Sequence, residues 1–352
     1  MVVAKSTPSV QADDEWSPLK SIIVGRAGKA CFPNAPRQMI EATMSPEHVH
    51  LFKPYAPFEE ALVAKAEAEL DCFAAILKEA GVHVVRPPPG IDWLALGGYT
   101  GAMPRDGLMS VGNTLIEACF AWPCRDREIE VAYAGILGDL AKDSRVKIVR
   151  RPKHTFTHSL LAGDSSKSGC YVINNSRPAF DTADFMRFGR IILGQLSHVT
   201  NQAGVDYVQE HLPTGYKIEL LEVNDPQAMH IDATILPLRE GLLVYHPEKV
   251  TEAALRKHQV LAGWDLQAYP FTPIECDDPP SYMSSPWLCL NALVLDGRRI
   301  VVEASDQKTA QWLESLGMEC VPCAFKHVNS IGGSFHCATV DLVREAVNDQ
   351  RR

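Results

Sequence analysis

Five times along this chain, a short apolar run leads into an amphipathic helix, a glycine and a second apolar run. In the first instance, residues 21–25 predict a buried strand. Apolar residues at helical spacing from Leu62 to Leu77 predict a helix that ends at Gly81, and residues 82–85 predict the next strand. Units of this kind in tandem favour a repeat architecture that can close into a ring, and an open doubly wound α/β sheet is the alternative.

The other four units are predicted to follow the same order. Their strands are expected within residues 107–120, 146–149, 170–173, 216–223, 233–236, 242–245, 290–295 and 299–302, and close to residue 321. Their helices are expected near residues 129–141, 184–212, 251–262 and 312–316. Residues 340–344 predict a short amphipathic tail.

Charge and composition exclude several classes of protein. The chain has 352 residues and a net charge of −9 without long runs of either sign, which argues against a nucleic-acid-binding protein. No apolar run approaches the roughly 20 residues of a membrane helix, and residues 1–16 are typical of a flexible polar leader rather than a secretory or transit signal. The ten cysteines are scattered, so reduced thiols in the cytoplasm are the default expectation.

Near the C-terminus, Cys337 follows a glycine pair, Gly332 and Gly333. Glycines let the backbone turn sharply, so this cysteine is a candidate nucleophile at a pocket mouth. Taken alone, a buried and inert thiol is the favoured interpretation, because free cysteine is among the most buried residue types. The Cys320-x-x-Cys323 pair lacks a second ligand pair for zinc, and no phosphate-binding glycine motif is present.

Polar residues upstream change the balance for Cys337. His230 and Asp232 enter a predicted strand and would share one face of it, although a solvent-facing edge has the same pattern. Asp106 precedes the strand predicted at residues 108–111. Asp181 lies where a loop becomes a helix, where it could equally be a helix cap.

Together these stretches resemble the arginine amidinotransferases. The resemblance covers residues 16–341 and rests on six motifs in order: Met103-Pro104-Arg105-Asp106, Val111-Gly112-Asn113, Phe180-Asp181-x-Ala183-Asp184-Phe185, Met229-His230-Ile231-Asp232-Ala233-Thr234, Tyr282-Met283-Ser284-Ser285 and Gly332-Gly333-Ser334-Phe335-His336-Cys337. It implies one catalytic domain over residues 17–352. The implied fold is a five-bladed pseudosymmetric α/β propeller of ββαβ modules, the pentein fold.

The resemblance also implies a role for each site residue. Cys337 would attack the guanidinium carbon of L-arginine, His230 would act as acid and base, and Asp181 would orient His230. Two carboxylates can grip a flat guanidinium by charge-assisted hydrogen bonds, and this role falls to Asp106 and Asp232. The remaining expected substrate-site residues are Met229, Gln227, Lys249, Ser284 and Ser285. The scheme uses no metal and no organic cofactor, takes L-arginine and a small amine as partners, and is compatible with a homodimer.

Three departures from the glycine-using members concern substrate recognition. Lys249 stands where those members have an arginine that clamps the substrate carboxylate, Gln227 stands where they have asparagine, and the loop at residues 153–169 is shorter. These changes favour an acceptor other than glycine, in specialised-metabolite biosynthesis. Two alternatives stay open: a guanidine hydrolase such as an arginine deiminase, and a catalytically inactive binding protein.

Overall fold

The computed structural model describes residues 7–152, 160–161, 171–272, 278–283 and 286–345. Within these ranges the strands form five three-stranded sheets. Each sheet has an antiparallel pair that is extended by a third strand running parallel to its neighbour. A helical crossover leads to that third strand, as a parallel connection requires. The five recurring units predicted from the sequence are therefore confirmed.

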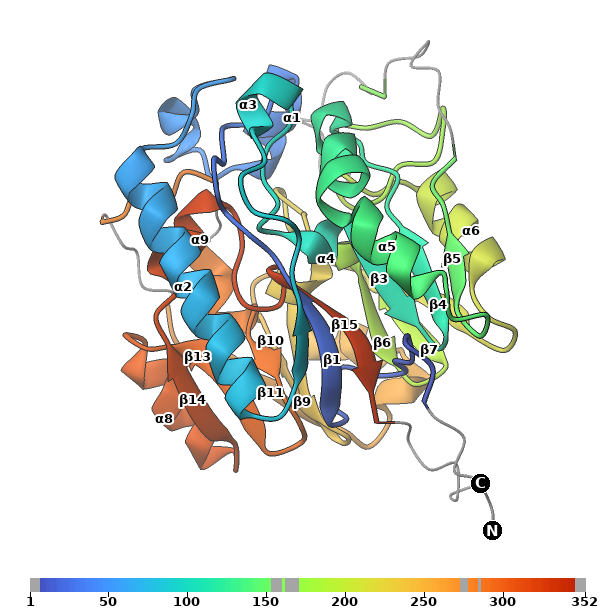
Figure 1. Cartoon of the computed structure of the whole chain (residues 1–352). Helices are drawn as coiled ribbons and strands as arrows, with labels where there is room; N and C mark the ends of the chain where they lie inside the picture. The colour runs from blue at the N-terminus through green and yellow to red at the C-terminus, as the bar shows by residue number, and fades with distance from the viewer. Residues whose placement is uncertain (1–6, 153–159, 162–170, 273–277, 284–285, 346–352) are drawn as a thin grey trace.

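One sheet combines the two ends of the described chain. Strand β15 (Thr339–Arg344) pairs antiparallel with β1 (Leu19–Val24), and β1 pairs in parallel with β2 (His83–Val85) after helix α2 (Glu60–Glu79). Figure 1 shows blue β1 and red β15 side by side. The prediction of an amphipathic tail at residues 340–344 is wrong, because this strand lies between β1 and the backbone of Gln11 and is buried throughout.

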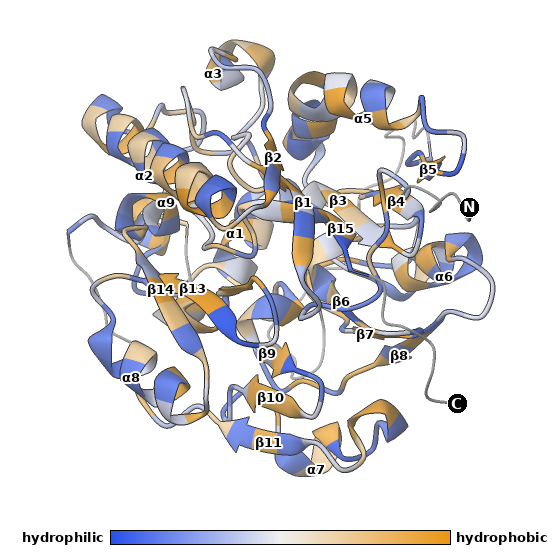
Figure 2. Ribbon diagram, turned by 60° about the horizontal axis from the view of Figure 1, so that its bottom comes forward, coloured by the Kyte–Doolittle hydropathy of each residue, from blue (hydrophilic) through white to orange (hydrophobic). Residues whose placement is uncertain are grey.

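The other four units, each with one sheet and one crossover helix, follow in chain order. Their helices lie at the periphery of the view in Figure 2. The second contains β3 (Leu108–Val111), β4 (Thr114–Glu117), α5 (Ala134–Leu140) and β5 (Lys147–Val149). The third contains β6 (Phe185–Phe188), β7 (Ile191–Gly194), α6 (Gln202–His211) and β8 (Lys217–Leu220). The fourth contains β9 (Ile235–Arg239), β10 (Leu242–Tyr245), α7 (Glu252–Leu255) and β11 (Asp265–Ala268). The fifth contains β12 (Leu293–Val294), β13 (Arg299–Glu303), α8 (Gln307–Ser315) and β14 (Glu319–Cys323).

Short helices occupy the connections between and within these units. They are α1 (Arg37–Thr43), α3 (Trp93–Leu96), α4 (Pro104–Gly107), α9 (Lys326–Ile331), the π-helical turn Glu128–Tyr133 and the 3-10 turns Val49–Leu51, Pro123–Arg125, Thr182–Asp184, Ile231–Ala233, Gln259–Leu261 and Pro286–Leu290.

The long helix predicted over residues 184–212 is wrong in its first half. Residues 185–194 form a hairpin, β6 and β7, whose turn contains Gly189 with φ of 69°. A short apolar run does not distinguish a buried strand from a helix by periodicity, and here strand pairing decides. The strand predicted at residues 170–173 is also absent, since residues 171–173 contribute an isolated pairing of Ile173 with Leu161, and residue 170 lies outside the described ranges.

The flexible leader predicted for residues 1–16 is wrong for residues 7–16. Val10 is fully buried, Ala12 exchanges backbone hydrogen bonds with Gly112, and Glu15 is buried against Arg187. The polar composition of this segment did not predict its burial, because its polar groups bind to partners far away in the sequence. Residues 1–6 lie outside the described ranges.

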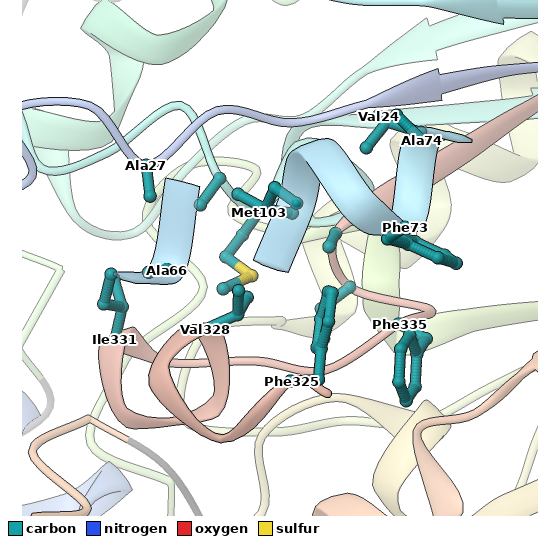
Figure 3. Packing of buried hydrophobic residues seen from close by; sticks show 14 of the residues in the cluster. Val24, Ala27, Ala66, Phe73, Ala74, Met103, Phe325, Val328, Ile331 and Phe335 are labelled. Atoms are coloured by element: carbon teal, nitrogen blue, oxygen red, sulfur yellow. The ribbon is translucent and has the colours of Figure 1, made fainter. Parts of the chain in front are cut away.

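A cluster of aromatic residues fixes the segment that leads to Cys337. Phe335 stacks on Phe325 with ring centroids 4.1 Å apart, and Phe73 of α2 contacts both rings edge-on (Figure 3). All three rings are fully buried or nearly so, and burial of one such ring is worth about 1.5–3 kcal/mol. The exposed face of α2 mixes alanines with charged residues. In the described ranges, no helix combines the length and the apolar character that crossing a membrane requires.

Candidate active site

The candidate site residues lie in the turns that precede the first strand of each unit. Asp106 belongs to α4 before β3, Asp181 precedes the 3-10 turn before β6, His230 and Asp232 lie in the turn before β9, Asn291 precedes β12, and Cys337 precedes β15. Each of the five units therefore supplies at least one residue. This equivalence explains how positions separated by more than two hundred residues reach one site.

Glycines shape the turn that holds Cys337. Gly332 has φ of 145°, which glycine tolerates and other residues rarely adopt. A Cβ on Gly333 would lie 2.7 Å from the Cβ of Cys337 and 2.5 Å from the sulfur of Met103, so this position requires close approach. The Cys337 side chain is only 2% exposed, and its backbone N–H donates to Asn291 Oδ1 at 3.0 Å.

His230 does not enter a strand as the sequence predicted. It has φ of 65°, in a region that non-glycine residues rarely occupy, and the 3-10 turn Ile231–Ala233 follows it. The first residue of β9 is Ile235. The turn nevertheless brings His230 and Asp232 to the same cavity, so the predicted proximity is right and its structural reason is different.

The histidine contacts two carboxylates. Its Nε2 lies 3.0 Å from Asp181 Oδ2, and its Nδ1 lies 3.6 Å from Asp106 Oδ1. The Asp181 side chain makes no capping bond to the 3-10 turn that follows it, so the alternative role as a helix cap is excluded. Burial alone would lower the pKa of His230, but Asp106, Asp181 and a bond to Cys337 together raise it well above its ordinary value. These contacts therefore favour the protonated imidazole.

The sulfur of Cys337 receives a hydrogen bond from Asn291 Nδ2 at 3.1 Å, and its thiol donates to Asp232 Oδ2 at 3.5 Å. Burial raises the pKa of this thiol to about 12, and the charges of Asp232 and Asp106 act in the same direction, against the opposing effect of His230. This environment therefore favours the neutral thiol. A nucleophile of this kind becomes reactive when a cation enters beside it.

Two carboxylate oxygens in the site have no hydrogen-bond partner within the described residues. They are Asp106 Oδ1 and Asp232 Oδ1, and both are buried. A buried acceptor without a donor is costly, so these two atoms are candidates for contact with a ligand or a water molecule. A guanidinium has five N–H donors in the free amino acid arginine and matches two such oxygens.

Buried cations that the sequence did not single out hold the other oxygen of each carboxylate. Arg125 Nη2 lies 2.9 Å from Asp106 Oδ2 and also contacts Glu128, while Nη1 of the same guanidinium contacts Asp181. His336 Nδ1 lies 2.8 Å from Asp232 Oδ2. Arg125 has no sequence signal, since it lies outside every motif, whereas His336 could have been suspected as the neighbour of Cys337 in the last motif.

A cavity of about 330 Å³ is lined by Cys337, His230 and Asp232 together with three of the expected substrate-site residues, Met229, Gln227 and Lys249. This volume is at the lower end of the range for small-molecule sites. Asp106 lines a smaller pocket that shares Met229 with this cavity.

Polar contacts hold the outer residues of the cavity in place. Lys249 Nζ lies 2.9 Å from Asp225 Oδ2, and Gln227 Nε2 donates to the carbonyl of Met44 at 2.8 Å. Ser284 and Ser285, and all of the 153–169 loop except residues 160–161, lie outside the described ranges.

The same centre contains ligand types that metals use. Atoms of Asp106, His230 and Cys337 lie within 4.8 Å of one another, and a carboxylate, an imidazole and a thiolate are zinc ligands. Asp106 is one of these three groups, and it also carries one of the two carboxylate oxygens that accept no hydrogen bond from the described residues. The expected absence of a metal and of an organic cofactor stays a prediction.

Comparison with known proteins gives clear relatives, although no family model matches the chain. The L-arginine:L-lysine amidinotransferase of Pseudomonas savastanoi pv. phaseolicola is 39% identical over an alignment that covers 96% of this chain and 95% of that protein. The mitochondrial glycine amidinotransferase of Danio rerio is 36% identical and covers 95% of this chain and 83% of its own length.

A solved structure extends the likeness to three dimensions. SxtG, an amidinotransferase of Microseira wollei in the saxitoxin biosynthetic pathway, superposes with a TM-score of 0.86 at 31% identity, over 96% of this chain and 98% of that one. The chain thus has the fold of the amidinotransferases, the pentein fold that the motifs implied. Since the sequence likeness spans nearly the whole length, the chain belongs to the amidinotransferases, enzymes that transfer an amidino group from an arginine-type donor.

Proposed function

We propose that this protein transfers the amidino group of L-arginine to an acceptor amine through a covalent amidino-cysteine at Cys337. The observation that carries the proposal is the pair of buried, unpartnered oxygens on Asp106 and Asp232 beside the Cys337 sulfur. Two fixed anions on a flat cation can hold its central carbon close to a nucleophile.

In the first half-reaction, the guanidinium of arginine binds between Asp106 and Asp232. Its charge offsets the two carboxylates that raise the thiol pKa, so Cys337 loses its proton to solvent as the substrate binds. The thiolate attacks the guanidinium carbon and forms a carbon–sulfur bond. The bond from that carbon to Nε then breaks, and the His230 imidazolium protonates the leaving nitrogen so that ornithine departs.

In the second half-reaction, neutral His230 accepts a proton from the incoming amine. The amine attacks the amidino carbon, the carbon–sulfur bond breaks, and Cys337 leaves as a thiolate. Asp181 keeps the imidazole oriented throughout by its 3.0 Å contact with Nε2. The scheme is ping-pong and needs no metal or organic cofactor.

The acceptor that fits the outer cavity best is an α-amino acid with a terminal amine, as in L-lysine. The Lys249 ammonium and the Asp225 carboxylate lie 2.9 Å apart and match the carboxylate and ammonium of an amino acid headgroup. Donor and acceptor occupy the site in turn, and lysine exceeds the departing ornithine by one methylene. Transfer to its terminal amine gives homoarginine, and the relative whose name pairs arginine with lysine supports this choice.

The arrangement of the fold supports the same reaction. We infer that the five units are blades of a pseudosymmetric propeller and that the turns before their first strands line its central channel. One catalytic domain over the folded part of the chain, a cytoplasmic location, a homodimer and a place in specialised-metabolite biosynthesis all stay predictions.

The decisive experiment is mass spectrometry of the enzyme mixed with arginine in the absence of an acceptor. An increase of one amidino group on the peptide that contains Cys337, together with released ornithine, is expected. Cys337→Ser should give neither, because a neutral hydroxyl is a far weaker nucleophile here. Arginine turnover without any adduct on Cys337 would refute the covalent scheme.

Acceptor choice and hydrolysis are separated by products. The enzyme charged with arginine is offered lysine, glycine, a diamine or an amino sugar, and homoarginine from lysine is the expected main product. A preference for glycine would refute the acceptor assignment. Citrulline or urea in place of a new guanidino compound would indicate the guanidine hydrolase.

A further inference from the structure

We propose that His336 is a positioning residue: held between Glu15 and Asp232 as an imidazolium, it fixes Asp232 for guanidinium binding. The inference rests on the proposed function for the identity of the guanidinium ligand. It assigns a role in the site to a histidine next to the nucleophile and to a residue near the N-terminus.

The geometry places one imidazole between two carboxylates. His336 Nδ1 lies 2.8 Å from Asp232 Oδ2, and its Nε2 lies 3.3 Å from Glu15 Oε2. All three side chains are buried. A neutral imidazole has one N–H and can donate to only one of them, so contact with both acids requires the doubly protonated ring.

Other groups around the ring agree with this charge state. Arg105 of α4 opposes it, with its Nε 3.4 Å from the His336 carbonyl, and burial opposes it as well. The Cys337 thiol donates to the same oxygen, Asp232 Oδ2, that the ring contacts. The carbonyl of Asn291 accepts from the backbone N–H of His336 and not from its ring. The two carboxylates prevail over burial and Arg105, and the pKa of His336 is raised.

The consequence for Asp232 is that its two oxygens have different environments. Oδ2 is held by His336, while Oδ1 is left without a partner. The bond to His336 also lowers the pKa of Asp232 against the effect of burial, so the carboxylate stays ionised for the substrate. Arg125 divides the oxygens of Asp106 in the same way, which shows the same arrangement on both guanidinium-binding acids.

Glu15 connects this arrangement to the N-terminal segment. Its two oxygens accept from Arg187 Nε at 2.7 Å and Nη2 at 2.6 Å, and Arg187 in turn pairs with Asp341 of β15. The carboxylate is thus fixed on one side by a permanent cation and faces His336 on the other. Residues 7–16 therefore complete the support of Asp232 rather than only cover the fold.

The test measures arginine binding in the Cys337→Ser background, where no transfer can occur. Calorimetry should show arginine binding to full-length Cys337→Ser. In the double variant that also carries His336→Gln, the arginine Kd should rise by about 10- to 100-fold, the range for one charge-assisted hydrogen bond. His258→Gln is the matched control: it removes a histidine–glutamate pair with a 3.1 Å contact outside the site and should leave the arginine Kd unchanged.

The pH dependence separates positioning from a purely structural role. Arginine affinity should fall as alkaline pH removes the second proton of His336. Glu15→Gln removes an anion that favours the charged ring, so the decline should move to lower pH. Equal arginine affinity with and without His336→Gln, or an unmoved alkaline limb in Glu15→Gln, would overturn the inference.

The wild-type protein gives an independent readout if a variant does not fold. Ring-nitrogen NMR at a pH where exposed histidines are neutral should show both ring nitrogens of His336 protonated, and a neutral His336 would overturn the inference. Failure of the proposed function gives different results: a wrong donor leaves Cys337→Ser without arginine binding, whatever residue occupies position 336, and a hydrolase gives citrulline or urea from the wild-type enzyme.

Discussion

Substitution of Arg125 by methionine should destabilise the protein strongly and abolish activity. Its guanidinium is 1% exposed and contacts three carboxylates: Glu128 at 2.9 and 3.0 Å, Asp106 at 2.9 Å and Asp181 at 3.3 Å. Methionine fills much of the same volume and removes the charge. The change therefore leaves buried acids that retain only His230 as a neighbouring cation in this cluster.

The magnitude follows from this environment. Removing one partner of a buried ion pair costs about 3–5 kcal/mol, because the remaining charge is left uncompensated. The three contacts do not add, since the acids can take up protons: burial already raises the pKa of Glu128 to about 8 with Arg125 present. We expect a loss of about 3–5 kcal/mol in unfolding free energy at neutral pH.

Urea denaturation of Arg125→Met and of the nearby control Arg127→Met measures the effect. Arg127 pairs with Glu130 at 2.9 Å, but both side chains are about half exposed, so the control should lose under about 1 kcal/mol.

Burial already raises the pKa of Glu128 to about 8, and that of Asp106 above its ordinary value, while Arg125 is present, and loss of Arg125 raises both further. The penalty relative to the wild type is then absent at low pH, appears where these acids ionise in the wild-type folded state, and should be smaller at pH 5 than at pH 8. Equal stability of the two variants at pH 8, or a penalty that shrinks as pH rises, would refute this reasoning.

Three further outcomes test individual features of the site. Asp181→Asn should reduce kcat by about 10²- to 10⁴-fold, because an amide no longer keeps His230 charged and oriented, and a loss under tenfold in steady-state assays would contradict this role. Alkylation of Cys337 by iodoacetamide in arginine-free enzyme should accelerate up to at least about pH 10, given a pKa of about 12, whereas a plateau near the ordinary value of about 8.5 would contradict it. Gly333→Ala places a Cβ 2.7 Å from that of Cys337 and should cost about 1–3 kcal/mol and most of the activity, while Gly135→Ala, with nothing within 4 Å, should be neutral in both assays.

The recurring units could be predicted because local patterns encode them. Glycines with positive φ, such as Gly81 and Gly317, end helices where the sequence indicated, and the strands beside them are buried apolar runs. Errors arose where the local pattern is ambiguous. Residues 185–194 are apolar enough for a helix, and only pairing between β6 and β7 decides their state.

The site could be predicted only in part. Cys337, His230, Asp106, Asp181 and Asp232 were identified through motifs, and all five meet at one centre in the structure. Their supports could not be identified in this way, because they act across the chain.

The contact between Glu15 and His336 shows why such supports escape sequence reasoning. It spans 321 positions, and near Glu15 the sequence gives only a polar segment. No periodicity or spacing connects two residues that meet through folding alone.

The turns that precede the first strands of the five units hold the reacting groups apart from the residues that would select the acceptor. Cys337 and the acids that face it are fixed by buried cations and by Asn291, which leaves little freedom to change them singly. Gln227 and Lys249 lie on the cavity wall. The Gln227 side chain donates to the carbonyl of Met44, and the Lys249 ammonium pairs with Asp225. Substitution there alters what an incoming amine meets without moving the nucleophile. Two of the three departures from the glycine-using pattern, those at Gln227 and Lys249, lie in this outer wall, so the proposed change of acceptor requires no new reaction.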